Sequence, residues 1–416
     1  MLSVDLNDER YDPTYQKMVA AFHGDAEVWS AINRDLRDAM VDFAVSHCPH
    51  YAERIDRKAA FEDIAILKKE DIRRNTEDLL AAGVSADRRL RLSTSGSTGE
   101  PLAFYRDLSQ GATEMISARR FLQRLHGVPE EAMTVWVQRS PPPWPRVHPL
   151  PTSELTPERL AEEVPVWMSF DSYWLYGNSS AFDWIAEEID RQGIGLPRKP
   201  ACVVTTADQL TDQGLDRITR VFERPVHSWY GSHEFNGYLA GTLPGTRRYA
   251  FNPLLAYVEV VGDDDRPVAP GGSGRLIVTD LNNYVMPFIR YDTGDVATTS
   301  REGFMGGFLL LESIEGRSSE MLRFPSGRFM SGIMLGQALR DADAFEPVRF
   351  YQCAQVGPKE LELRVVWHSA PDEASRAKMI SVLREFADPD FDIGVRNVEE
   401  LETLPSGKRW IVKREF

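Results

Sequence analysis

The most informative part of the sequence is the stretch Leu92-Ser93-Thr94-Ser95-Gly96-Ser97-Thr98-Gly99-Glu100-Pro101. Five hydroxyl side chains and two glycines fill the seven positions from Ser93 to Gly99. Glycines let backbone N–H groups turn toward a ligand, and Ser and Thr hydroxyls add uncharged donors, so the stretch suits a phosphate-binding loop. A flexible linker has a similar composition, and the stretch alone leaves both readings open. It is not a Walker A loop, because no lysine follows the last glycine, so positive charge must come from elsewhere.

Length and composition indicate a globular protein of two or three domains, with 416 residues, 42% hydrophobic and 27% charged. A net charge of −15 argues against partners that are nucleic acids or anionic membranes. The N-terminus MLSVDLNDER is polar, and no run of eighteen apolar residues occurs, so we expect neither a signal peptide nor a membrane span. The three cysteines lie far apart, which predicts no disulfide framework and suits the cytoplasm.

The pattern of the chain predicts an α/β protein with mixed sheets. Residues 1–90 have helical periodicity, residues 90–290 alternate strands and helices, and a compact α+β segment begins near residue 314. The expected strands include Thr134–Val137, Cys202–Thr205, Pro225–Ser228 and Leu276–Thr279, and the expected helices are about Gln110–Leu125, Ser179–Gln192 and Thr211–Val221. The Pro-rich stretch Arg139–Pro165 predicts a long surface loop or lid.

A second informative block is Trp229-Tyr230-Gly231-Ser232-His233-Glu234, which follows an expected strand. A carboxylate beside a polar turn can bind Mg²⁺, a hard cation that shares its oxygen ligands with phosphates. Alternatively, Glu234 simply begins a helix, where a carboxylate is favourable in any case.

A third block, Met286–Asp295, runs from an apolar stretch into Thr293-Gly294-Asp295. The Asp295 carboxylate is suited to accept two hydrogen bonds from a ribose diol. An aspartate that shapes its own turn is the alternative.

Two further blocks lie toward the C-terminus. Glu315-Gly316-Arg317 marks the change of pattern and indicates a hinge or a plain connector. Lys408, in Ser406-Gly407-Lys408, can swing a flexible ammonium into a site built elsewhere, or can remain a solvated lysine.

The five blocks follow one another as a Ser/Thr/Gly loop, Tyr-Gly-x-x-Glu, Tyr-x-Thr-Gly-Asp, Gly-Arg and Ser-Gly-Lys. One such match arises easily by chance, whereas five in this order do not. The chain resembles the adenylate-forming superfamily of acyl-CoA synthetases, adenylation domains and luciferases, and most of all its phenylacetate-CoA ligase/CapK-like branch. Segments 64–72 and 274–281 are also similar to that branch, so the resemblance covers nearly the whole chain.

The resemblance implies a large N-terminal domain, residues 1–316 with a helical lead-in over 1–90, and a small mobile α+β domain, residues 317–416. It implies ATP and Mg²⁺, a carboxylic acid substrate and an acyl-adenylate intermediate. CoA is the expected acceptor. Two alternatives remain. In the first, the enzyme passes the activated group to a carrier protein or an amine, or activates another oxyanion. In the second, the protein is an inactive nucleotide-binding homologue. A homodimer is left open.

The resemblance also assigns roles to residues of this chain. The pyrophosphate would be cradled by Ser95, Gly96, Ser97, Thr98 and Gly99. The adenine side would be formed by Tyr230 and by the segment Ala207-Asp208-Gln209. Gly231 and Ser232 would also bind ATP. Asp295 and Arg317 would hold the ribose, Glu234 would bind Mg²⁺, and Lys408 would bridge the carboxylate and the α-phosphate.

Three positions depart from the family pattern: Glu100 replaces a lysine, His233 replaces a hydroxyl residue, and Ser319 replaces the hinge aspartate. His233 lies beside the reacting groups in this scheme, so it would act as a donor, a base or a specificity residue, unless it is a simple hydrogen-bonded substitute. Trp136 ends an expected strand and Trp229 adjoins the second block, so both are expected to line a pocket for an aromatic or apolar acid.

Overall fold

The computed structural model describes residues 13–93, 102–107, 110–138, 145–151, 155–206, 210, 212–235, 238–317, 321–323, 329–331, 348–367, 373–386, 388–401 and 412–415. These residues form two compact units, one that ends at Ile314 and one that begins at Glu315. The predicted domain boundary, between residues 316 and 317, stays a prediction.

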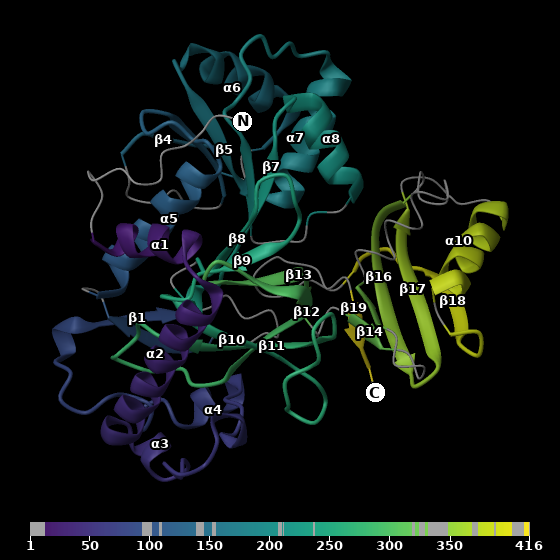
Figure 1. Ribbon diagram of the computed structural model, residues 1–416. Helices are drawn as coiled ribbons and strands as arrows, with labels where there is room; N and C mark the ends of the chain where they lie inside the picture. Colours follow the sequence, from purple (N-terminus) through teal and green to yellow (C-terminus); the bar gives the residue numbers. More distant parts are fainter. Residues whose placement is uncertain are drawn as a thin grey trace. The chain divides into compact units, whose positions relative to one another are not determined.

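An eleven-stranded sheet forms the centre of the first unit (Figure 1). In sheet order its strands are β10 (Ala256–Val261), β11 (Ser273–Asp280), β12 (Tyr291–Met305), β13 (Phe308–Arg317), β9 (Tyr249–Phe251), β8 (Ala240–Thr242), β7 (Val226–Tyr230), β6 (Val203–Thr206), β5 (Tyr173–Asn178), β3 (Met133–Val137) and β4 (Val147–Pro149). Strands β4, β3, β5, β6 and β7 are parallel to one another, whereas β7 pairs antiparallel with β8. The sheet is mixed, as the sequence predicts.

Helices α6 (Pro157–Ser169), α7 (Ser179–Gln192) and α8 (Asp212–Phe222) cover the parallel half of the sheet (Figure 1). Helix α7 has the predicted bounds, and it ends at Gly193, whose φ of +66° suits a glycine. The large side chains on the sheet-facing side of these helices, such as Trp167, Phe182 and Phe222, are completely buried.

The interpretation of Arg139–Pro165 as an irregular loop is wrong for its described part. Residues 147–149 form β4, and α6 begins at Pro157. Thr156 Oγ1 accepts the backbone N–H of Arg159 at 3.1 Å, and Pro157 occupies a first-turn position where its missing N–H costs little. Leu160 and Val164 bury the inner face of the helix, which outweighs the presence of Pro165 inside it.

The remaining elements of the first unit are the lead-in helices, α5 and a small hairpin. The lead-in contains α1 (Pro13–His23), α2 (Ala26–His47), α3 (Pro49–Ala52), η1 (Phe61–Asp63), α4 (Lys69–Arg74) and η2 (Ala86–Arg88), in agreement with the predicted helical start. Helix α5 spans Gln110–Leu125 as predicted. Strands β1 (Arg89–Ser93) and β2 (Ala103–Asp107) form an antiparallel pair on either side of the Ser/Thr/Gly stretch, and Ser93 pairs with Ala103.

The second unit is of the predicted α+β type. Its four-stranded sheet has the order β18 (Asp392–Asn397), β17 (Glu360–Trp367), β16 (Val348–Gly357), β19 (Val412–Arg414), with helix α10 (Glu373–Phe386) and the short pair β14 (Met321–Arg323) and β15 (Phe329–Ser331) beside it. Leu363, Val365, Met379 and Leu383 are almost fully buried, so sheet and helix share a core.

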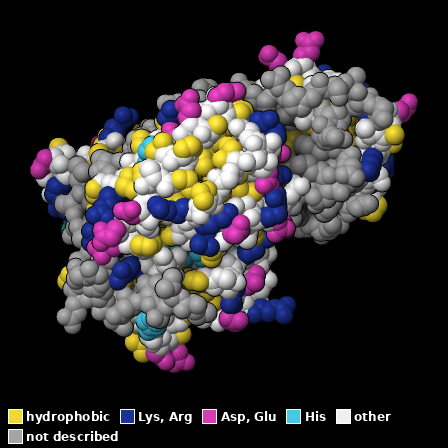
Figure 2. All heavy atoms as spheres, turned by 90° about the horizontal axis from the view of Figure 1, so that it is seen from above, with side chains coloured by type: hydrophobic (Ala, Val, Ile, Leu, Met, Phe, Trp, Pro, Cys, Tyr) yellow, Lys and Arg dark blue, Asp and Glu magenta, His cyan; other side chains and the backbone are white. Residues whose placement is uncertain are grey.

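The surface carries both signs of charge. Basic and acidic side chains are interspersed over the described residues of the face in Figure 2, in keeping with 48 basic and 63 acidic residues in the chain. Within the described residues, no helix combines the length and the apolar character needed to cross a membrane.

Candidate active site

Two short segments, Tyr230–Glu234 and Tyr291–Asp295, are joined by hydrogen bonds at both of their ends. The Tyr230 hydroxyl donates to Asp295 Oδ2 at 2.5 Å. The Tyr291 hydroxyl donates to Glu234 Oε1 at 3.0 Å. Each bond joins the first residue of one segment to the last residue of the other, so the structure holds the two carboxylates at opposite ends of one short, cross-linked unit.

This unit lies where the sheet changes direction. Strand β7, which ends at Tyr230, is parallel to β6 on one side and antiparallel to β8 on the other. Thr206, the last residue of β6, donates its hydroxyl to the Trp229 carbonyl at 3.0 Å. Ligands of open α/β sheets commonly bind outside the carboxyl ends of parallel strands at such a change, which makes this edge a candidate binding site.

Asp295 is placed by a bulge in β12. The pairing passes from Arg275 opposite Val296 to Ile277 opposite Asp292, so the segment Thr293–Asp295 faces a single residue of β11. Gly294 has a φ of +82°, which few other residues adopt easily. The Asp295 N–H donates to Thr293 Oγ1 at 3.1 Å, so the Thr-Gly-Asp sequence shapes the bulge as well as supplying a carboxylate.

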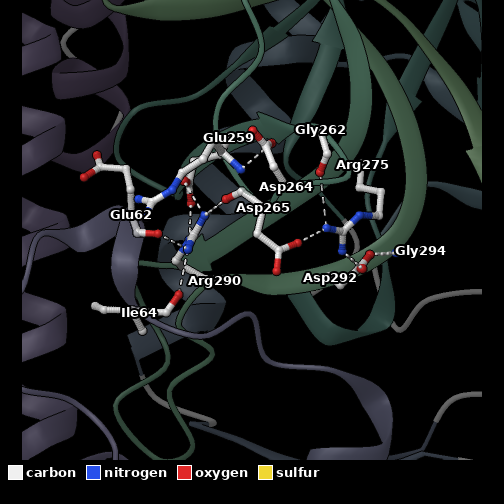
Figure 3. A network of polar contacts seen from close by, with 11 residues as sticks. Glu62, Ile64, Glu259, Gly262, Asp264, Asp265, Arg275, Arg290, Asp292 and Gly294 are labelled. Atoms are coloured by element: carbon white, nitrogen blue, oxygen red, sulfur yellow. Dashed lines mark hydrogen bonds and ion pairs between the residues drawn. The ribbon is translucent and has the colours of Figure 1, made fainter.

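A polar network fixes the start of β12 (Figure 3). Arg275 donates to Asp292 Oδ2 at 2.8 Å, and Asp292 Oδ1 accepts the Gly294 N–H at 2.9 Å. The buried Arg290 guanidinium donates to both carboxylate oxygens of Glu259 at 3.1 Å. It also donates to the carbonyl oxygens of Glu62, Ile64 and Asp265 at 2.7, 2.6 and 3.0 Å. Arg290 therefore fastens the lead-in segment to the sheet.

Glu234 is a buried carboxylate with one oxygen engaged. Its side chain is 6% exposed, and Lys69 Nζ, from the start of α4, lies 3.9 Å from Oε1. Within the described residues, Tyr291 and Lys69 both contact Oε1, so Oε2 can bind a cation. The described part of the chain has no group of three or more His, Cys, Asp or Glu residues suited to a metal. One carboxylate fits Mg²⁺ that takes its other ligands from phosphates and water.

Tyr230 is a protonated hydrogen-bond donor in this site. Burial raises the pKa of its phenol well above 10, and the neighbouring Asp295 carboxylate raises the pKa further, because ionisation would place two negative charges together. Tyr230 therefore donates to Asp295 throughout the neutral and mildly alkaline range.

The structure describes only some of the other predicted site residues. Gly231 and Ser232 link β7 to the short 3-10 turn His233–Phe235, and the Ser232 hydroxyl is buried with no hydrogen-bond partner among the described residues. Arg317 is the last residue of β13. The structure describes the side chains of neither His233 nor Arg317. Outside the described residues lie Ser95, Gly96, Ser97, Thr98, Gly99, Glu100, Ala207, Asp208, Ser319 and Lys408.

Trp136 and Trp229, the two expected pocket residues, belong to one aromatic group. Tyr176 stacks on Trp136 with ring centroids 4.5 Å apart, and its ring lies 5.4 Å from that of Trp229. The Arg119 guanidinium of α5 lies 5.9 Å from the ring centroids of both Trp136 and Trp174. All of these side chains are at most 8% exposed, so the group is a packed aromatic wall.

Several residues of this site escape a sequence-based search. Lys69 and Tyr291 both contact Glu234, and Arg106 donates to the Glu234 carbonyl oxygen. Tyr291 begins the Tyr-x-Thr-Gly-Asp motif of the third block, so its position is a usable signal. Lys69 lies in the segment 64–72 that resembles the family branch, but nothing in that segment assigns it to the site. Arg106 lies in no recognised motif, and only the folded chain brings both residues to Glu234.

Comparisons with known proteins agree with this architecture. The sequence matches no protein-family model. Protein CapK of Staphylococcus aureus is 22% identical over 368 residues, which cover 82% of this chain and 78% of CapK. A 2-hydroxyisobutyryl-CoA ligase in the postadenylation state, in complex with 2-HIB-AMP, aligns with a TM-score of 0.74 at 17% identity. That alignment covers 98% of this chain and 94% of the ligase.

Two more distant structures share the fold. The o-succinylbenzoate CoA synthetase of Bacillus subtilis, in complex with ATP and magnesium ion, has a TM-score of 0.56 at 14% identity over 77% of this chain and 68% of the synthetase. The amide bond synthetase McbA of Marinactinospora thermotolerans covers 80% of this chain, and 70% of McbA is covered, at 14% identity. The chain therefore has the fold of the adenylate-forming enzymes, which confirms the predicted resemblance and the predicted fold class at the level of the fold.

Proposed function

We propose that this protein is an ATP-dependent ligase that activates a carboxylic acid as an acyl-adenylate, releases pyrophosphate and transfers the acyl group to CoA. One observation carries the proposal. The reciprocal bonds Tyr230–Asp295 and Tyr291–Glu234 build a unit with a cation-binding carboxylate at one end and a diol-binding carboxylate at the other. ATP combines a magnesium-bound triphosphate with a ribose diol in one molecule, so it matches both ends.

In the first half-reaction, a carboxylate oxygen of the acid attacks the α-phosphorus of ATP. An acyl–O–P bond forms, the bond to the β-phosphate bridging oxygen breaks, and pyrophosphate leaves with its electron pair. Glu234 would hold Mg²⁺ through Oε2, and this ion supplies positive charge against the phosphate oxygens. Tyr291 orients the Glu234 carboxylate, and Asp295 accepts the ribose hydroxyls. No protein nucleophile is needed, because positioning and electrostatics suffice.

Other roles in this reaction belong to residues outside the described part of the chain. The loop Ser95–Gly99 would bind the β- and γ-phosphates through amides and hydroxyls. Lys408 would bring its ammonium to the carboxylate and the α-phosphate. Ala207 and Asp208 would lie at the adenine.

In the second half-reaction, the CoA thiolate attacks the acyl carbonyl carbon and AMP leaves. Rotation about the predicted hinge near Gly316 would withdraw Lys408 and admit the thiol. His233, beside Glu234, would act as a donor, a base or a specificity residue at the acid. We place the reaction in the cytoplasm, since Cys48, Cys202 and Cys353 are all buried free thiols that suit a reducing compartment.

The acid is expected to be aromatic or apolar, as in phenylacetate-CoA ligases. The support is the aromatic wall of Trp136, Tyr176 and Trp229, which reaches β7 immediately before Tyr230. Flat apolar substrates gain both area burial and ring stacking against such a wall.

An amine or a carrier-protein thiol is the second candidate acceptor. It has specific support, because McbA, which shares this fold, is described as an amide bond synthetase. Acceptor choice would leave the adenylation half-reaction unchanged.

The test is ATP–pyrophosphate exchange over a panel of aromatic, aliphatic and hydroxylated acids, followed by product analysis with CoA. Acid-dependent exchange together with an acyl-CoA product supports the proposal. Exchange with product formed only when an amine or carrier protein is supplied supports the second candidate. Binding of Mg·ATP without exchange for any acid would contradict both and favour an inactive nucleotide-binding homologue.

A further inference from the structure

The hairpin β1–β2 connects the Ser/Thr/Gly stretch to the rest of the first unit. Ser93 and Ala103, which pair with each other, are the last described strand residues on either side of that stretch. The contacts of β1 and β2 with other segments therefore fix where Ser93 and Ala103 lie. Strand β2 is held against the segment that follows β11: Asn283 Nδ2 donates to the Tyr105 carbonyl at 2.9 Å, and the Tyr105 N–H contacts Met286 Sδ at 3.4 Å.

Arg106 makes a different contact from this strand. Its Nη1 donates to Asp280 Oδ2 at 2.7 Å and also donates to the main-chain carbonyl oxygen of Glu234. The side chains of Arg106 and Asp280 are 4% and 3% exposed, so both charges are taken out of water. One guanidinium thus joins the hairpin, the end of β11 and the main chain of the candidate magnesium-binding residue.

The main chain of Glu234 is part of a short turn. It lies in the three-residue turn His233–Phe235, in which the Phe235 N–H donates to the Ser232 carbonyl at 3.0 Å. A turn this short does not by itself fix the direction of a carboxylate, and a charge-assisted hydrogen bond from a buried guanidinium is among the stronger ways to hold a carbonyl.

We propose that Arg106, held by Asp280, is a positioning residue that locks the Glu234 main chain to the β1–β2 hairpin. The lock would hold the main chain of the proposed Mg²⁺-binding carboxylate at a fixed position relative to strand β2. This inference rests on the proposed function for its chemistry, while the lock itself is a statement about the main chain that can be measured separately.

The test compares three isosteric or near-isosteric changes. Arg106→Met and Asp280→Asn break the lock, and Arg106→Lys is the conservative variant. Glu163→Gln is the matched control, because it also neutralises a buried carboxylate paired with an arginine, and its partners Arg159 and His148 belong to α6 and to the edge strand β4. The readouts are amide hydrogen exchange of the segment 229–235, the Mg²⁺ concentration for half-maximal pyrophosphate exchange, and calorimetric binding of Mg·ATP without acid.

We expect Arg106→Met and Asp280→Asn to speed hydrogen exchange at 229–235 at least tenfold and to raise the Mg²⁺ requirement at least tenfold, with the KM for the acid within twofold. Arg106→Lys should recover most of the Mg²⁺ dependence. Glu163→Gln should lower thermal stability and leave both quantities unchanged.

The positioning role is overturned if the Arg106 and Asp280 variants fold and keep wild-type hydrogen exchange and Mg²⁺ dependence, or if Glu163→Gln shifts both equally. If Arg106→Met does not fold, Arg106→Lys and Asp280→Asn still test the positioning role. Failure of the proposed function has a separate signature: wild-type protein that neither binds Mg·ATP nor exchanges pyrophosphate. In that case, hydrogen exchange of the segment 229–235 still tests whether Arg106 holds the main chain of Glu234.

Discussion

At the scale of single residues, the candidate site uses phenols to orient carboxylates. Glu234 and Asp295 each accept a hydrogen bond from a tyrosine of the opposite segment. A phenol with a raised pKa, as at Tyr230, stays protonated, so it orients the Asp295 carboxylate without adding a charge of its own. Replacing either tyrosine should therefore affect nucleotide binding more than folding.

Tyr291→Phe is expected to weaken pyrophosphate exchange by roughly ten- to hundredfold, because a hydrogen bond to a charged group is worth about 1.5–3 kcal/mol. The loss should appear in the apparent affinity for Mg·ATP. Tyr173→Phe is the control, since its hydroxyl donates to the Arg198 carbonyl at 2.8 Å, on β5 and away from Glu234. Steady-state exchange kinetics measure both, and equal effects of the two changes would contradict the role given to Tyr291.

Lys408→Ala is expected to slow acyl-adenylate formation by roughly 10²–10³-fold, about 2.7–4 kcal/mol, as for loss of one preorganised donor at a reacting centre. Transfer of a preformed acyl-adenylate to CoA should keep its rate, because the proposed domain rotation would withdraw Lys408 for that step. The control is Lys413→Ala, whose ammonium lies 3.0 Å from Glu415. Full exchange activity in Lys408→Ala would refute the assignment.

At the scale of elements, β7 combines the site with a buried histidine pair. His227 of β7 stacks on His126, which follows α5, with ring centroids 3.7 Å apart and planes 5° from parallel. His126 Nδ1 accepts from the Trp229 indole at 3.0 Å, so its Nε2 carries the proton and donates to the Thr242 carbonyl at 2.8 Å. Burial lowers the pKa of both rings, and that of His227 falls to about 4.

This pair predicts a loss of stability in acid. Between the ordinary pKa of 6.5 and about 4, the unfolded His227 is protonated while the folded one is not, so the free energy of unfolding falls as the pH falls through this range. His227→Phe keeps a stacked ring and removes the titration. We expect wild type to lose about 2 kcal/mol more than the variant between about pH 7 and 5, by urea unfolding. Parallel losses would contradict this account.

The tip of the β12–β13 hairpin predicts a difference between two glycines. Gly306 has a φ of +56°, and a Cβ there would lie 2.3 Å from the Phe22 carbonyl oxygen of α1. Gly303 has a φ of +74°, but a Cβ there would meet nothing within 4 Å. Gly303→Ala should cost about 1–2 kcal/mol of stability from its backbone conformation alone, and Gly306→Ala clearly more. Chemical unfolding of both variants tests this, and equal costs would rule out the close contact.

At the scale of the whole molecule, the first unit contains Tyr230, Glu234 and Asp295, the described residues that are proposed to bind Mg·ATP. Seven of the nine tryptophans precede residue 315, and Trp367 and Trp410 follow it, so intrinsic fluorescence reports mainly on the first unit. The charges on the face in Figure 2 are mixed in sign, so they provide no signal comparable to tryptophan fluorescence.

Mg·ATP at one hundred times its dissociation constant should stabilise the fluorescence-detected unfolding transition by about 2.7 kcal/mol. Chelation of Mg²⁺ with EDTA should remove most of this gain, because Glu234 alone would then repel the triphosphate. Glu234→Gln should likewise lose the dependence on Mg²⁺. If the melting temperature in the presence of Mg²⁺ did not change on addition of ATP, this result would contradict nucleotide binding to this unit.

Local sequence determined much of this protein. The five ordered blocks indicate the adenylate-forming fold, and helices α5 and α7 have the predicted bounds because amphipathic periodicity and, for α7, Gly193 are local signals. Helix α6 was not predicted, because Pro157 and Pro165 were interpreted as loop residues while the cap at Thr156 and burial in the core decided otherwise. Local patterns predict a helix poorly when its stability comes from packing.

Only the tertiary structure decided which residues meet. Tyr291 reaches Glu234, Tyr230 reaches Asp295, and Arg106 reaches both Asp280 and Glu234, across separations that no periodicity encodes. The sequence specifies which side chains can bind a cation, a diol or a phosphate. Sheet pairing and burial specify their partners, because strand order and the bulge in β12 set the distances between segments far apart in the chain.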